Sequence, residues 1–255
     1  MSKFGTEFAP QGAPALPLWI GGHAFLTVTE AFFDVRAADG KVLRRVPLCG
    51  AAEVATAVDN AQAAVPAWRA LEASARAAAF VALHDLLARY RGHLARLLVE
   101  EAGLSEAAAD AEMGRALAAV SGILPKPAGC GGDVVAVLND QSAPIAEPLA
   151  CTAEALLAGN VVLLKPSPKA PSALLALAEL FTRAGFPAGT VNLVQGDEAA
   201  VRALADNTQI TAIACVAEDA VCHAVSGMLS GAGKVLVAGR GDATLAHWRT
   251  RLGIV

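Results

Sequence analysis

The sequence predicts an α/β fold built on a doubly wound parallel sheet, and three observations support this. Short apolar runs rich in β-branched residues alternate with helical segments throughout the second half of the chain. Those runs are continuous rather than alternating, which is typical of strands buried on both faces. The first half has a different pattern, a hairpin followed by long helical segments. We expect one domain over residues 18–255, preceded by a flexible arm over residues 1–17 that contains three prolines.

Composition excludes several classes of protein. Hydrophobic residues make up 55% of the 255 residues and charged residues only 17%, so disorder is not expected. A formal charge of -4 and the lack of a basic run argue against nucleic acid or a membrane surface as partner. The N-terminus has no apolar signal segment. Five cysteines without a regular spacing indicate a reduced, cytoplasmic protein, namely Cys49, Cys130, Cys151, Cys215 and Cys222.

Turn and cap signals place the elements of the first half. Gly21-Gly22 lies between apolar residues and predicts a hairpin over residues 18–25. Asp39-Gly40 marks a second turn, followed by a strand over residues 41–46. Ser74 and Ser105 are N-cap candidates. Three helices are expected, over residues 51–69, 74–103 and 105–120, the second either continuous or restarted near His93.

A loop rich in proline and glycine at residues 125–132 separates the two halves. The strands expected after it are residues 134–138, 161–164, 191–194, 210–216 and 234–237. The helices expected between them are residues 145–157, 172–184, 198–205 and 219–229. We interpret Arg240-Gly-Asp242, which follows the last strand, as a turn.

Five segments carry a resemblance to a known family. They are Trp19-Ile-Gly-Gly, Val65-Pro-Ala-Trp-Arg69, Ala158-Gly-Asn160, Leu164-Lys-Pro-Ser167 and Gly185-Phe-Pro-Ala-Gly-Thr-Val-Asn-Leu-Val-Gln-Gly196. In their order and spacing the chain resembles the aldehyde dehydrogenase superfamily. The resemblance implies a Rossmann-like cofactor domain, on which a nicotinamide cofactor lies while a cysteine thiolate attacks an aldehyde.

The chain departs from that family at the positions that carry out the family's reaction. Counting back from Asn160, Ser142 stands where the family has the asparagine that donates to the oxyanion. Val237 stands in place of the glutamate base. The pyrophosphate turn Gly-Ser-Thr-x-x-Gly is replaced by residues 217–222, which lack both glycines and include Glu218. Carboxylates at a helix N-terminus favour the helix but repel a pyrophosphate.

Two residues of the family's cofactor site are kept. Lys165 and Ser167 follow a predicted strand and are our candidate cofactor-binding residues, although Pro168 replaces the acid that holds the ribose. The alternative interpretation is that Lys165 is exposed to solvent at the end of the strand. Cys215 and Cys222 are expected to be core residues rather than nucleophiles. The resemblance implies that the nucleophile belongs to a separate catalytic domain, which we expect to be absent. We also expect the family's oligomerisation flap to be absent, because only residues 114–133 occupy the position of that segment in the chain.

We therefore expect a non-catalytic domain of this family, with no metal and no cofactor, that acts by binding another protein. The resemblance suggests a full-length aldehyde dehydrogenase or an enzyme of the same pathway as that partner, or a homo-oligomer. One alternative is a module that binds NAD(P) or another nucleotide through Lys165. Another is one half of a split aldehyde dehydrogenase.

Overall fold

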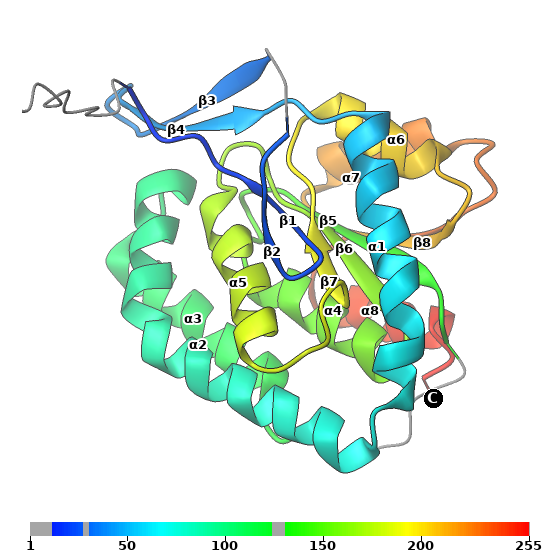
Figure 1. Ribbon diagram of the computed structural model, residues 1–255. Helices are drawn as coiled ribbons and strands as arrows, with labels where there is room; N and C mark the ends of the chain where they lie inside the picture. The colour runs from blue at the N-terminus through cyan, green and yellow to red at the C-terminus, as the bar shows by residue number, and fades with distance from the viewer. Residues whose placement is uncertain (1–11, 28–30, 124–130, 255) are drawn as a thin grey trace, which may run out of the picture.

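The computed structural model describes residues 12–27, 31–123 and 131–254 (Figure 1). The elements in the first half are β1 (Leu18–Ile20), β2 (His23–Phe25), β3 (Phe32–Arg36), β4 (Val42–Pro47), α1 (Ala51–Ala70), α2 (Ala73–Ala102) and α3 (Glu106–Val120). Those in the second half are β5 (Val134–Asn139), α4 (Ala146–Leu157), β6 (Val161–Lys165), α5 (Ser172–Arg183), β7 (Val191–Leu193), α6 (Glu198–Asp206), β8 (Ile210–Val216), α7 (Asp219–Leu229), β9 (Val235–Ala238) and α8 (Gly241–Arg251).

The main sheet has seven strands in the order β2-β1-β7-β6-β5-β8-β9. Strands β5 to β9 pair in parallel, which confirms the predicted fold class. The predicted hairpin extends one edge, because β1 pairs antiparallel with β7 through Trp19 and Leu193. Gly21 and Gly22 have φ of 62° and 80°, which a two-residue turn of this type requires.

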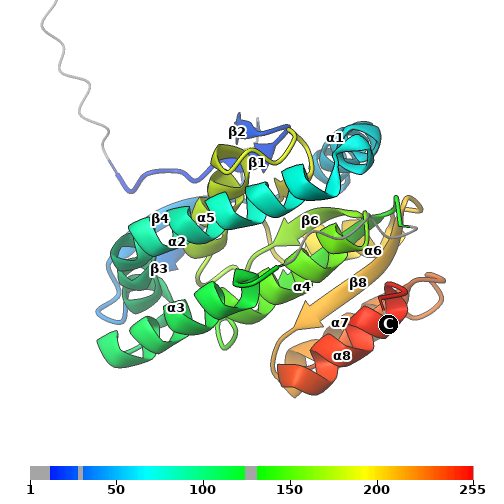
Figure 2. The same ribbon diagram turned by 90° about the horizontal axis from the view of Figure 1, so that it is seen from below.

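Helices cover both faces of the sheet (Figure 2). Helices α4, α5 and α8 lie on one face, with α2 and α3 packed outside α4 and α5. Helices α1, α6 and α7 lie on the other face. Right-handed crossovers require this split, because the chain runs from β5 to β7 in one direction and then returns to β8 on the other side of β5.

The predicted helices of the first half are confirmed, but the N-cap predicted at Ser74 is wrong, because α2 begins at Ala73 with Glu72 in the N-cap position. Helix α2 is continuous over 30 residues and ends at Gly103, whose φ of 69° suits the left-handed C-cap. The Ser105 hydroxyl accepts a hydrogen bond from the Ala108 N–H at 3.2 Å and caps α3. These helices and the sheet share one aromatic cluster, in which Trp68 stacks on Phe186 with ring centroids 5.3 Å apart.

Two regions differ from expectation. The turn predicted at residues 240–242 is instead the start of α8, an eleven-residue helix anchored by Trp248. Of the predicted flexible arm, residues 1–11 lie outside the described residues. In the part that is described, the Leu16 N–H donates to the Arg45 carbonyl at 2.8 Å, so the chain before β1 is tied to β4. No helix in the described ranges has the length and apolarity needed to cross a bilayer.

Candidate functional site

A cavity of about 330 Å³ opens at the carboxyl ends of β5, β6 and β8. Strand β5 sits where the strand order reverses, with β6 on one side and β8 on the other. Open α/β sheets bind ligands at such a switch point, because the loops after neighbouring strands diverge to opposite faces. The floor includes Leu138 and Cys215, and the walls include Val201 of α6 together with Val221 and Val225 of α7.

Asp140 ties the loop after β5 to the start of α7. Its carboxylate accepts hydrogen bonds from the Ser142 N–H at 2.8 Å, the Ser142 hydroxyl at 2.5 Å and the Glu218 N–H at 2.9 Å. Burial alone would raise the pKa of Asp140, but these hydrogen bonds outweigh it and lower that pKa. The positive end of α7 therefore already has an anion, supplied by this chain.

Asn139 holds two loops of the cavity in place. Its side-chain N–H₂ donates to the Asp140 and Ala143 carbonyls at 2.9 and 2.8 Å, and its Oδ1 accepts from the Ser167 N–H at 3.1 Å. The Ser167 hydroxyl in turn accepts from the Lys169 N–H at 3.2 Å. Ser167, a candidate from sequence, therefore lines the cavity but uses its hydroxyl oxygen to form a local turn.

Lys165, the other candidate, lies at the end of β6 and also lines the cavity. The residue is only 4% exposed, so the alternative prediction that Lys165 lies exposed to solvent at a strand end is wrong. Within the described residues its ammonium group has no hydrogen-bond or ion-pair partner. Burial lowers the pKa of Lys165 to about 8, opposed mainly by the negative charge of Asp197.

The other positions singled out by sequence are not brought together as a reactive set. Ser142 lies beside the cavity with its hydroxyl bound to Asp140. Val237 is buried on β9. Cys215 and Cys222 are buried, as predicted, and the Cys222 thiol donates to the carbonyls of Cys215 and Ala217.

Carboxylates from elsewhere in the chain bind the N-termini of four helices. Glu112 accepts from the Ala146 N–H of α4 at 2.8 Å, and Glu101 accepts from the Ser172 N–H of α5 at 3.0 Å. Asp140 binds the N–H of Glu218 ahead of α7, and Glu147 binds the first N–H of α8 at 2.9 Å. Helix N-termini that could attract an external anion are thus satisfied internally.

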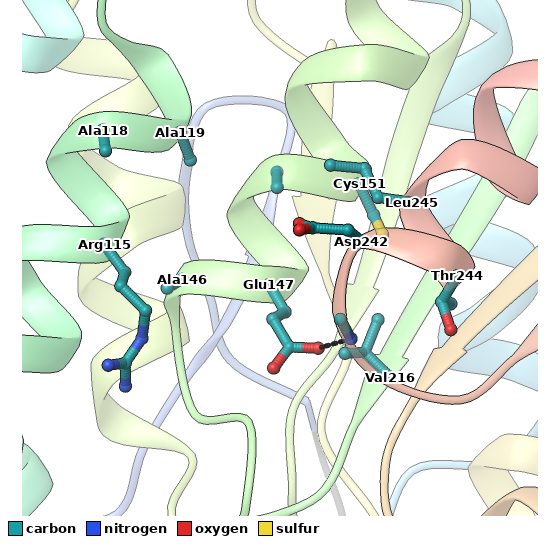
Figure 3. Close-up of a pocket in the computed structure, with 12 residues that line it drawn as sticks. Arg115, Ala118, Ala119, Ala146, Glu147, Cys151, Val216, Asp242, Thr244 and Leu245 are labelled. Carbon is teal, nitrogen blue, oxygen red and sulfur yellow. Dashed lines mark hydrogen bonds between the residues drawn. The ribbon is translucent and has the colours of Figure 1, made fainter.

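A second cavity, of about 390 Å³, lies between α3, α4 and α8 (Figure 3). Small side chains form most of its wall, among them Ala118, Ala119 and Ala146, with Leu245 contributed by α8. The Arg115 side chain lies at one side and the Glu147 carboxylate points towards the start of α8. Helix α8 forms one side of this cavity, and the sequence did not predict that helix.

A family model described as the aldehyde dehydrogenase family matches residues 27–139 and 126–241. The chain belongs to the aldehyde dehydrogenase family. It is 32% identical over 236 residues to malonate-semialdehyde dehydrogenase 1 of Geobacillus kaustophilus, covering 85% of this chain and 48% of that protein. It is 34% identical over 191 residues to the NADP-dependent succinate-semialdehyde dehydrogenase of Escherichia coli, covering 68% of this chain and 40% of that protein.

Solved structures of the family agree with the fold. A putative methylmalonate-semialdehyde dehydrogenase from Sinorhizobium meliloti, solved with NAD, has a TM-score of 0.82 at 28% identity and covers 91% of this chain and 51% of its own. Proline utilization A from Bdellovibrio bacteriovorus has a TM-score of 0.78 at 23% identity, covers 89% of this chain and 26% of its own, and supports the fold alone. The chain spans about half the length of the curated relatives it matches.

Two features of the site were not found by sequence reasoning. Asp140 follows a buried strand at the switch point, which was the available signal, but its contact with α7 depends on a residue far along the chain. The family match ends at residue 241, so α8 is almost wholly outside the matched region. No family pattern therefore indicated that Glu147 would bind the N-terminus of that helix.

Proposed function

We propose that this chain is a non-catalytic member of the aldehyde dehydrogenase family that acts by binding another protein. The observation that carries the first part is the contact of Asp140 with Ser142 and Glu218. An oxyanion needs free donors at the point where its charge develops. Here the Ser142 hydroxyl donates to a carboxylate, and a second negative charge beside Asp140 would be repelled.

The nucleophile and the base are not supported either. The cysteines that the structure describes are all buried, and burial raises the pKa of Cys49 and of Cys151 to about 12 and also raises that of Cys215. Thiols in such surroundings are inert, because the thiolate is the reactive form. Val237 offers no carboxylate in the position of the family's base.

The ribbon of β3 and β4 supports the second part of the proposal. In the described ranges these strands form a separate two-stranded sheet, which projects from the body (Figure 1). Within the described residues β3 pairs only with β4, so its other edge is available for a strand of a partner. Leu26, 77% exposed, precedes this ribbon in the chain. Our proposed partner is a full-length aldehyde dehydrogenase or an enzyme of the same pathway.

The proposal is tested by purifying the tagged chain from its native cell and identifying what accompanies it. We expect an aldehyde dehydrogenase or a pathway enzyme in a fixed ratio, and a complex that re-forms from the purified proteins. Phe33→Asp on β3 should abolish the complex, while Val81→Asp, which changes a 58% exposed residue on α2, should leave it intact. A chain that stays monomeric, or that reduces NAD with an aldehyde on its own, would refute the proposal.

A second candidate function is nucleotide binding, which the cavity lined by Lys165 and the apolar residues of α6 and α7 favours. The family's relatives include a protein solved with NAD. In this chain Asp140 and Glu218 do not fit a pyrophosphate at the start of α7, so Lys165 and Lys169 are the groups of the cavity left to hold an anion. Calorimetry with NAD, NADP, ATP and coenzyme A decides the matter. No heat and no shift in Tm at millimolar ligand would end this candidate.

The split-enzyme alternative makes a different prediction. A reconstituted mixture with a second polypeptide would then produce NADH from an aldehyde, and Ser142→Ala would abolish that activity. We expect no activity, because the Ser142 hydroxyl is bound to Asp140 in the chain itself.

A further inference from the structure

Lys165 combines three properties that the proposed function does not use. It is almost fully buried, it faces a cavity of about 330 Å³, and it has no hydrogen-bond or ion-pair partner in the described part of the chain. A buried ammonium without a counter-ion is unfavourable, and the usual relief is loss of its proton. A neutral lysine amine is a nucleophile.

The walls of the cavity favour the neutral amine. Leu138, Val201 and Val225 line it with apolar side chains, which solvate an ammonium group poorly. Burial lowers the pKa of Lys165 to about 8, so about a tenth of the amine is unprotonated at neutral pH. The titratable groups around the cavity or coupled to this amine are Cys49, Asp140, Lys169, Asp197, Cys215 and Glu218.

We propose that Lys165 is a covalent capture site for small aldehydes that carry an anionic group, which it holds as an imine. The amine nitrogen attacks the carbonyl carbon to form a carbinolamine. Water then leaves with the former carbonyl oxygen, and a C=N bond joins the ligand to Nζ. No oxidant or reductant takes part.

The charges at the rim select the ligand. Lys169 is exposed at one side of the cavity, while Asp140 and Glu218 lie at the side where α7 begins. An anionic group therefore fits beside Lys169 and is repelled from the α7 side. An aldehyde that carries a phosphate or a carboxylate matches this arrangement, and pyridoxal 5′-phosphate is a suitable probe.

The test is labelling of the folded chain with pyridoxal 5′-phosphate, followed by borohydride reduction and peptide mapping. A pKa lowered from the ordinary value of 10.5 to about 8 raises the neutral fraction about 300-fold, and the lower basicity offsets about half of that on a logarithmic scale. We therefore expect Lys165 to be labelled roughly 10- to 20-fold faster than Lys169 at neutral pH. Its rate should rise with a midpoint near pH 8.

Two variants separate capture from simple charge. Lys165→Arg keeps the cation but cannot form an imine, so the label at this site should vanish, and Tm should fall because a buried guanidinium cannot lose its proton. Lys169→Met should leave the Lys165 amine reactive towards a neutral aldehyde but weaken capture of the phosphate-bearing probe. If Lys165→Arg fails to fold, the position of the label and the pH dependence of labelling in the unchanged chain still test the proposal. Equal or faster labelling of Lys169, or a midpoint in the range of an ordinary lysine, would overturn the proposal.

Discussion

The carboxylate of Asp140 binds the backbone N–H of Glu218 at 2.9 Å, joining residues 78 positions apart in the sequence. The contact spans the switch point of the sheet, because Asp140 follows β5 and Glu218 precedes α7. It places a negative charge of the chain at the positive end of a helix, where such folds receive anions. The same residue that stabilises this end of the sheet therefore disfavours an external phosphate.

Asp140→Ala should lower the free energy of unfolding by about 1–2 kcal/mol, because it removes a helix cap and leaves the Glu218 N–H without its partner. Urea unfolding followed by circular dichroism measures the change. Asp59→Ala is the matched control, since Asp59 is exposed on α1 and should change stability by less than about 0.5 kcal/mol. Equal effects of the two variants would show that the contact contributes nothing.

The contribution of Asp140 should also depend on pH. Its folded-state pKa is lowered, so its stabilising effect is complete above the unfolded pKa, about 3.9, and is lost as pH falls through the lower folded value. The stability difference between the wild type and Asp140→Ala should therefore be constant near neutrality and shrink in strong acid. Urea midpoints of both proteins from neutral to acidic pH measure it, and a difference independent of pH would contradict the assignment.

Sequence patterns were sufficient for the sheet and for most helices because those elements follow local rules. The apolar runs that became β5, β6 and β8 are continuous and bounded by turns, and the cap at Ser105 formed as predicted. Helix α8 could not be predicted in this way. It has glycine at its start and a single buried residue, Trp248, so it shows no apolar periodicity and depends on contacts with α4.

The candidate site was predicted only in part, because several of its features depend on contacts between residues far apart in the sequence. The sequence located Lys165 and Ser167 at the end of a strand, and both line the cavity. Burial of Lys165 depends on the elements that pack against β6, and no local sequence pattern predicts that packing. The binding of Asp140 to α7 requires knowing that β5 and β8 are neighbours.

Trp248→Ala should release α8 from the body while leaving the sheet folded. Trp248 is fully buried, and its indole N–H donates to the Cys151 carbonyl of α4 at 3.0 Å. Removing a buried tryptophan costs about 3–5 kcal/mol, more than the surface ion pair of Arg249 with Glu154 can offset. Limited proteolysis should cut within α8 of the variant but not of His247→Ala, a change at an exposed neighbour. Resistance equal to the wild type would contradict this account.

Glu101→Ala should destabilise the chain by about 1–3 kcal/mol, and Glu101→Gln by less. The buried carboxylate accepts from the Ser172 N–H and hydroxyl at the start of α5, and a glutamine oxygen can still serve the N–H. Burial raises the pKa of Glu101, so the wild type should lose stability as pH rises from the unfolded pKa, about 4.3, to the higher folded value. Glu101→Gln should lack that loss in urea unfolding at each pH, and identical pH profiles would refute it.

Freeing the start of α7 from carboxylates should create affinity for a pyrophosphate. In the double variant Asp140→Asn and Glu218→Gly, two negative charges leave the helix N-terminus and its N–H groups become available. Each of these partly solvated carboxylates repels a pyrophosphate by about 1 kcal/mol, so their removal should tighten ADP binding by about tenfold or more relative to the unchanged chain. Calorimetry measures the affinity, with circular dichroism to confirm the fold and Glu198→Gln, an exposed change on α6, as the control. Adding Lys169→Met should reduce the gain, since Lys169 is an exposed cation that lines the cavity. An affinity unchanged by the double variant would mean that something other than these carboxylates keeps the anion out.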